Sequence, residues 1–391
     1  MMEYIETETR NSSLPDLVEM LQKQADVRYD IVVPSSDLEF KAGNLTVKGG
    51  GVDMREDGVH TTDVDLAPTT IFDEGLAKRF NIPLKYVKTL RERVAVDVLE
   101  ADPTWVPTLY DENMNYWLNA DKTKQHLVRG FRTDDTDSIG IARAFLSNKY
   151  KTIDNYDVLM ATLDGVKQAG VQIEIDGADL SDKRMSLRLV CPQVKEYAPE
   201  ILKSYRSPFT GETGADNPTM FAGLVIKNSE TGNGAFTIVP RLFVQVCSNG
   251  LQVSKDAMRA VHLGEKLDEG IIRWSDDTQR RELDLITSKT RDAVATFLDV
   301  KYMQTKIIEL SNLAEVDVVN PPKTIQRVSK KTHWSDTEQE SILRHFIQGG
   351  DTSALGLAQA VTSVAQTVNS PDRQDELETS AMVAAELATI N

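Results

Sequence analysis

Hydrophobic residues recur every three or four positions in the N-terminal part of the chain, which is the spacing of amphipathic helices. Residues 14–29 have this spacing, with Ser13 as the expected N-cap and a proline in the first turn. Residues 73–93 predict two short helices joined near Asn81, with several basic residues. Their spacing resembles a helix-turn-helix, but the turn glycine usual in that motif is absent, so a plain packed helix pair is favoured.

The middle of the chain has the alternating pattern of half-buried strands. Residues 171–175 and 185–189 each alternate with period two, and Asp176-Gly177 between them predicts the turn of an antiparallel pair. Nearer the N-terminus, three consecutive glycines (residues 49–51) follow a strand-like run. No Lys-Ser or Lys-Thr comes after them, so we expect a flexible hairpin there and not a phosphate-binding loop.

Residues 221–226 and 235–246 predict a second hairpin, and its connector, residues 228–234, permits two interpretations. As a plain turn, it needs only its two glycines for positive φ angles, and its other polar residues are interchangeable. As a clamp, it places Lys227 and Arg241 at its mouth, where they would hold a bound strand. The clamp predicts that removing both cations weakens binding and barely changes stability.

The C-terminal third returns to the helical period. Residues 283–313 predict one or two long amphipathic helices, and residues 318–331, with two prolines, predict a basic linker. The tail is helical again from Ser335, and the Ser-Pro pair at 370–371 marks the beginning of a further helix. This alanine-rich tail either caps its own chain or packs on a partner or a neighbouring subunit.

Together these elements predict an α+β fold, in which an antiparallel sheet-rich central region packs with helices and a helical region follows at the C-terminus. Hydrophobic residues make up 40% of the 391-residue chain, which is enough for a sizeable core. We expect four parts: an N-terminal α+β region over residues 1–120, a strand-rich core over 121–253, a helical region with the basic linker over 254–334, and an acidic helical tail over 335–391.

Apolar runs in this chain fall far short of the ~20 residues that span a bilayer. The acidic N-terminus also lacks the basic and apolar regions of a signal peptide. Cys191 and Cys247 have no CxxC spacing, so neither a disulfide framework nor a four-thiolate zinc site is expected. We therefore expect a soluble cytoplasmic protein with no membrane partner.

The net charge of −16 is distributed unevenly along the chain. It is −10 over residues 1–120, −1 over 121–230, +2 over 231–335 and −7 over 336–391. A near-neutral middle is thus flanked by acidic ends, which argues against indiscriminate binding to nucleic acids or membranes. Either a local basic face on the middle holds a polyanion, or the middle simply has an average surface.

No local catalytic signature is present. The histidines share neither HxxxH nor HExxH spacing, and the GxSxG, GxxxxGK[ST] and GxGxxG motifs are absent. We therefore expect no cofactor and no metal, and a non-enzymatic function is favoured. A metal-dependent nuclease remains an alternative, in which Asp134, Asp137, Asp154 and Asp157 would converge on a divalent cation.

Several segments in order resemble the phage/plasmid-like protein family, the domain of unknown function numbered 932: residues 143–150, 153–155, 158–159, 221–223, 228–232, 246–250, 262–264, 358–362 and 365–366. The resemblance extends from about residue 14 to residue 385. It implies a mobile genetic element in a bacterial cytoplasm, and it brings no activity or catalytic residues. Phages often encode single-strand annealing proteins that have a curved antiparallel sheet backed by helices and that form rings or filaments, an organisation compatible with this chain by analogy alone.

The leading hypothesis is a non-enzymatic nucleic-acid-binding protein of the single-strand annealing type, which binds single-stranded or duplex DNA and forms a homo-oligomer. The expected phosphate-binding residues are Arg129, Arg132, Arg143, Lys149, Lys151, Arg188, Lys227 and Arg241. The expected stacking residues are Phe145 and Tyr150, although such aromatics are more often part of a core. The alternative is a structural or interaction protein that binds a host factor, as a DNA mimic or an inhibitor, through its acidic surface.

Overall fold

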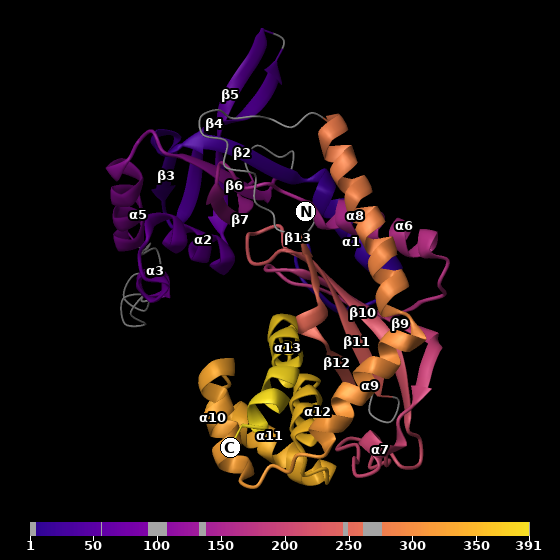
Figure 1. Cartoon of the computed structure of the whole chain (residues 1–391). Coiled ribbons are helices and arrows are strands. Elements are labelled where there is room, and N and C mark those ends of the chain that lie inside the picture. The colour runs from indigo at the N-terminus through magenta and orange to yellow at the C-terminus, as the bar shows by residue number, and fades with distance from the viewer. Residues whose placement is uncertain are drawn as a thin grey trace.

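Two β-sheets and a C-terminal group of helices form an α+β fold, which confirms the predicted fold class (Figure 1). The structure is a computed structural model that describes residues 5–55, 57–92, 108–132, 138–244, 249–260 and 276–390. The N-terminal sheet with its helices lies at one end, the second sheet lies in the middle, and the helical tail lies at the other end.

The N-terminal sheet has six strands in the order β2-β6-β7-β5-β4-β3. Its strands are β2 (Arg28–Pro34), β3 (Leu38–Lys41), β4 (Asn44–Arg55), β5 (Gly58–Pro68), β6 (Gln125–Phe131) and β7 (Gly140–Ser147). Neighbouring strands are antiparallel except β5 and β7, which are parallel. Strands β4 and β5 continue beyond the sheet as a projecting hairpin (Figure 1). Because β6 and β7 complete this sheet, it extends past residue 120.

Three helices pack on the N-terminal sheet: α2 (Thr70–Phe80), α3 (Leu84–Glu92) and α5 (Thr108–Ala120). Helix α2 ends at Asn81, whose φ of 56° is left-handed and suits asparagine better than most residues. Arg91 of α3 forms an ion pair with the buried Asp73 of α2, so this arginine joins two helices of the N-terminal sheet. The expected pair of packed helices is therefore confirmed.

The second sheet is antiparallel, with the order β1-β8-β9-β10-β11-β12, and β13 also pairs with β11. Its strands are β1 (Thr9–Ser12), β8 (Glu174–Leu180), β9 (Met185–Tyr197), β10 (Thr219–Asn228), β11 (Phe236–Val244), β12 (Asn249–Gln252) and β13 (Met258–Ala260). The predicted hairpin of residues 221–246 is present as β10–β11. The other predicted pair is antiparallel as expected, but its first strand is β8 and not residues 171–175.

Two glycine-bearing segments lie inside strands and not in the turns that the sequence predicted. The β8–β9 turn comprises residues 181–184, whereas Gly177 lies within β8 at a φ of 153°, beside a shift in register. Residues 49–51 lie within β4, where a Cβ on Gly50 would stand 2.4 Å from the hydroxyl of Tyr29. Glycine permits an irregular backbone in β8 and the close approach of another side chain in β4. Either of these uses explains a glycine that is not in a turn.

Side chains of the second sheet divide into an apolar face and a polar face, because successive residues of a strand point to opposite sides. The apolar face carries Leu187, Leu189, Leu224, Ile226 and Ile238, all of which are buried. The polar face carries Arg188, Lys227 and Arg241, one from each of three adjacent strands. The sheet thus brings together three cations that are far apart in the sequence.

Four helices belong with the second sheet: α1 (Leu14–Asp26), α6 (Asn155–Ala169), α8 (Asp276–Phe297) and α9 (Val300–Ala314). Ser13 caps α1 as expected, since its hydroxyl accepts the backbone N–H of Asp16. Residues 283–313, for which one or two long helices were predicted, form two, α8 and α9, which extend along the side of the molecule (Figure 1).

The C-terminal helices are α10 (Pro321–Thr332), α11 (Asp336–Gly349), α12 (Ala354–Ala365) and α13 (Pro371–Ala388). Ser335 opens α11 with a capping box and Ser370 caps α13, which confirms the helical tail. The predicted basic linker over 318–331 is wrong, because these residues form α10. Its two prolines occupy the first turn, where a helix tolerates them, and Ile325 and Val328 are buried.

Candidate nucleic-acid interface

The structure does not gather the eight predicted phosphate-binding residues on one open face. Arg129, Arg143, Arg188 and Arg241 are buried, and the side chain of Lys227 is only 13% exposed. Of the other three, Lys149 is exposed, Arg132 is half-buried, and Lys151 forms an ion pair with Glu282 at 2.6 Å. The enclosed cations belong to two separate ionic groups.

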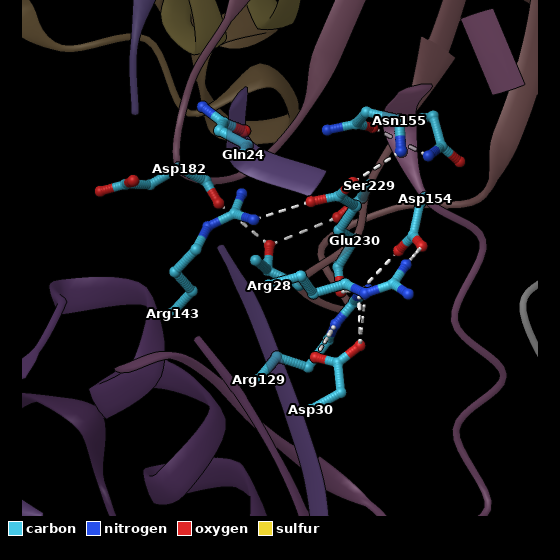
Figure 2. Close-up of polar contacts among 12 residues, drawn as sticks. Gln24, Arg28, Asp30, Arg129, Arg143, Asp154, Asn155, Asp182, Ser229 and Glu230 are labelled. Atoms are coloured by element: carbon cyan, nitrogen blue, oxygen red, sulfur yellow. Dashed lines mark hydrogen bonds and ion pairs between the residues drawn. The ribbon is translucent and has the colours of Figure 1, made fainter. Parts of the chain in front are cut away.

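The first ionic group lies where the two sheets meet, and its centre is Arg129 of β6 (Figure 2). Its Nε and Nη2 atoms donate to the two carboxylate oxygens of Asp30 at 2.8 and 2.9 Å. Nη2 also donates to Asp154, the N-cap residue of α6, at 2.6 Å, and Arg28 forms a further ion pair with Asp154. One guanidinium therefore joins two strands of the N-terminal sheet to a helix of the second sheet.

Glu230 extends this group into the connector between β10 and β11 (Figure 2). Its Oε2 atom accepts from Arg143 at 2.7 Å, and its Oε1 atom accepts from the backbone N–H of Asn155 at 2.6 Å. Its backbone oxygen accepts from Arg129 at 3.3 Å. A single connector residue thus contacts both sheets, and sequence reasoning missed this role because the partners are 75 to 101 residues away.

The remaining polar residues of the connector also point inward. Ser229 and Thr231 are buried, and both hydroxyls donate to the backbone oxygen of Lys183 in the β8–β9 turn, at 2.7 and 3.2 Å. The interpretation as a plain turn with interchangeable residues is therefore wrong. The clamp interpretation fails on its structural premise, since the mouth cations are enclosed and paired.

Burial and the neighbouring guanidiniums have opposite effects on the carboxylate pKa values in the first ionic group. Burial raises the pKa of Asp154, but the Arg129 and Arg28 guanidiniums outweigh burial and hold this pKa below its usual value. For Asp30, burial is the larger effect, and it raises the pKa despite the attraction of Arg129. A cavity of about 20 Å³ beside these residues has room for one water molecule and no larger ligand. This group holds the two sheets together.

The second ionic group lies on the polar face of the second sheet, and we call its cations, Arg184, Arg188, Lys227 and Arg241, the cationic strip. Arg188 pairs with Asp179 and Arg241 pairs with Asp176, both on β8. The other carboxylates of this group come from α13. Three predicted cations, Arg188, Lys227 and Arg241, therefore lie on one face, and that face is covered.

The two predicted stacking residues are not open to bases. Phe145 is fully buried and stacks on His126, with a distance of 4.4 Å between the ring centroids. Tyr150 is half-buried, and its hydroxyl donates to the backbone oxygen of Ser229 at 3.2 Å. Burial raises the pKa of Tyr150 to about 12. Both aromatics thus serve packing, which was the expectation for most such residues.

The proposed carboxylate site does not form within the described residues. Asp154 is committed to Arg129 and Arg28, and Asp157 lies on the exposed side of α6. Asp134 and Asp137 lie outside the residues that the structure describes. In the described ranges, no group of three or more His, Cys, Asp and Glu side chains is placed to hold a metal ion.

Helix α10 carries the exposed cations that the sequence analysis assigned to a linker. Lys323, Arg327, Lys330 and Lys331 are all exposed, and the helix contains no acidic residue. Their spacing of four, seven and eight positions places them on one side of the helix, opposite the buried Ile325. Arg327 donates from Nη2 to the backbone oxygen of Leu387 in α13 at 3.0 Å. Among the described residues, no carboxylate forms an ion pair with any of the four. We call this surface the basic face of α10.

No helix within the described ranges has both the length and the apolar character needed to cross a membrane. Comparison of the chain with protein-family models, with curated proteins and with solved structures finds no match. The resemblance to the phage/plasmid-like protein family therefore stays a prediction.

Proposed function

We propose that this chain is a non-enzymatic nucleic-acid-binding protein that holds phosphates on the basic face of α10. The observation that carries the proposal is the contrast between two kinds of cation. The sheet cations Arg129, Arg143 and Arg241 are neutralised inside the fold. The four cations on the basic face of α10 have no carboxylate partner among the described residues. Exposed cations without counter-charges attract polyanions, since each phosphate contact releases condensed counterions.

The geometry of the basic face suits a nucleic-acid backbone. Residues 323 to 331 rise about 12 Å along the helix axis at 1.5 Å per residue. This length matches three or four phosphates of one strand, which follow each other at about 3.4 Å along a duplex. Helix α10 is anchored by the buried Ile325 and Val328, so its cations are presented from a rigid support. Such contacts fix a backbone and do not read bases.

Three or four phosphate contacts give modest affinity at physiological salt. Several copies of the chain bound along one strand would add their contacts, and this multiplication is what the annealing role requires. We therefore extend the proposal to a homo-oligomer that binds single-stranded DNA without sequence preference. The acidic remainder of the surface, in a chain of net charge −16, opposes binding elsewhere on the molecule.

The test is fluorescence anisotropy of a labelled 30-nucleotide oligothymidine over a series of salt concentrations. The variant K323A/R327A/K330A/K331A removes the basic face, and K41A/K85A/K122A/K301A removes four other exposed lysines as the matched control. We expect the first variant to lower the slope of log affinity against log salt by about 3, near 0.7 to 0.9 per lost contact. Equal binding by the two variants, or no binding by the unmodified chain at low salt, would contradict the proposal.

A further inference from the structure

Helix α13 lies over the polar face of the second sheet and supplies carboxylates to it. Asp372, Asp375 and Glu378 are spaced three residues apart, which places them along one side of the helix. Arg184 forms ion pairs with Asp372 at 3.3 Å and with Asp375 at 2.9 Å. Lys227 pairs with Asp375 as well.

The same contact continues towards β11 and β12. Arg241 lies 3.8 Å from Glu378, and Gln252 of β12 donates to Asp375 at 3.2 Å and to Glu378 at 2.9 Å. Both Asp375 and Glu378 are buried by this contact. Electrostatic attraction from Lys227 and Arg184 outweighs burial and lowers the pKa of Asp375, so it stays ionised at neutral pH.

The side of α13 that packs on α12 is apolar. Leu377, Ala381 and Ala385 are buried in the hydrophobic core that α13 shares with α12. Apolar residues thus hold the helix to its helical neighbour, whereas ionised residues hold it to the sheet. Helix α13 therefore contacts α12 by apolar packing and the second sheet by ion pairs.

Stability alone gives little reason for the ionic contact. A buried ion pair gains little beyond the cost of removing its charges from water, and apolar residues of similar volume would hold a helix on a sheet at least as well. The contact is also incompletely packed, since a pocket of about 270 Å³ is lined by Arg184, Lys227 and Asp375. Cations on adjacent strands and in the β8–β9 turn, with carboxylates supplied by a separate helix beside an open pocket, are arranged as an exchangeable site for anions.

We infer that the cationic strip is a second binding face for nucleic-acid phosphates, and that α13 covers it with carboxylates that occupy the places of phosphates. The inference rests on the proposed nucleic-acid-binding function. It adds a second binding site, for which α13 competes with the nucleic acid. With α13 in place the strip is neutralised. With α13 displaced, the carboxylates that remain paired with the four cations of the strip, among the described residues, are Asp176 and Asp179 of β8, so the exposed face is cationic. A bound strand and α13 then exclude each other.

The first test compares two variants that each remove three negative charges from the C-terminal helices. D372N/D375N/E378Q neutralises the side of α13 that faces the strip, and its amides keep most hydrogen bonds. D336N/E340Q/E376Q neutralises three exposed carboxylates as the matched control. We expect the first variant to bind the labelled oligothymidine at least tenfold more tightly than the control, with a salt slope larger by about 2. Equal affinities and slopes would overturn the inference.

A second measurement uses the unmodified chain, because the first variant leaves buried cations unpaired and some copies will not fold. Hydrogen exchange is followed with and without saturating oligothymidine. We expect amides of α13 to lose protection at least tenfold when the strand is bound, while β10 and β11 keep theirs. Unchanged protection in α13 at saturation would overturn the inference even where the variant has failed to fold.

The outcomes separate the two proposals. In the first outcome, binding depends on the basic face of α10, α13 stays protected, and D372N/D375N/E378Q binds as the control does. This result supports the proposed function and rejects the cationic strip as a binding face. Tight binding by D372N/D375N/E378Q that survives K323A/R327A/K330A/K331A keeps the strip and removes α10. An absence of binding by every folded variant removes both.

Discussion

The Nη2 atom of Arg129 lies 2.6 Å from the Oδ1 atom of Asp154, and this ion pair connects strand β6 of one sheet to the N-cap of α6 beside the other. Both side chains are enclosed, at 4% and 16% exposure. The pair therefore acts as a joint between two halves of the fold and not as a surface contact.

Arg129→Met should lower the free energy of unfolding by about 3–5 kcal/mol, because it leaves the Asp30 and Asp154 carboxylates enclosed without their shared partner. Urea unfolding followed by circular dichroism measures the change. Lys149→Ala is the control, since this exposed lysine should alter stability by no more than about 0.5 kcal/mol. A loss below 1 kcal/mol for Arg129→Met would show that the joint is dispensable.

The double variant Lys227→Ala with Arg241→Ala should be destabilised by at least about 3 kcal/mol, because Asp375 and Glu378 remain buried without cations. This reverses the expectation of the clamp interpretation, under which stability barely changes. Denaturant unfolding of this variant beside Lys323→Ala with Lys330→Ala, two exposed lysines, decides between them. Equal stability of the two double variants would show that the buried Asp375 and Glu378 do not depend on these two cations.

His126 should make the fold sensitive to acid. Burial, with help from the charges of Arg79 and Lys124, lowers the pKa of this fully buried ring to about 4. The unfolded ring takes up a proton near pH 6.5 and the folded ring does not, so stability falls as the pH drops from about 6.5 towards 4.

His126→Gln should remove roughly 1–2 kcal/mol of this dependence on pH, although it also lowers stability at pH 7 through lost packing on Phe145. Unfolding free energies from pH 7 to pH 4.5 provide the measurement. Parallel profiles for the unmodified chain and His126→Gln would show that the ring does not control the acid response.

Gly75→Ala should be destabilising although alanine favours helices by about 1 kcal/mol over glycine. The added Cβ would stand 2.6 Å from the backbone oxygen of Phe145, because α2 lies directly on β7. Forced separation of the two elements should cost more than the helical gain, for a net loss of about 1–2 kcal/mol in thermal or urea unfolding. Lys78→Ala on the exposed side of α2 is the control, and a stabilised Gly75→Ala would mean that helix and strand separate freely.

Local sequence signals located most of the elements. These signals act over a few residues, so they can be recognised without the rest of the fold. Examples are the Ser-Pro pair at 370–371, the capping residue Ser335 and the alternation in β9 to β11. The errors share one cause. Prolines at the beginning of α10 and glycines inside β4 and β8 each permit two local structures, and only tertiary packing selects one, such as the burial of Ile325 and the approach of Tyr29 to Gly50.

The sequence by itself determined the α+β class, many of the helices and strands, and the acidic ends around a near-neutral middle. Only the tertiary structure decided which cations are available, because a charge is neutralised by whatever lies beside it in space. Arg129 meets Asp154 across 25 residues, and Arg184 meets Asp375 across 191. Chain folding over such separations enclosed the arginines that the sequence favoured, and it left the unfavoured helix α10 with its cations exposed.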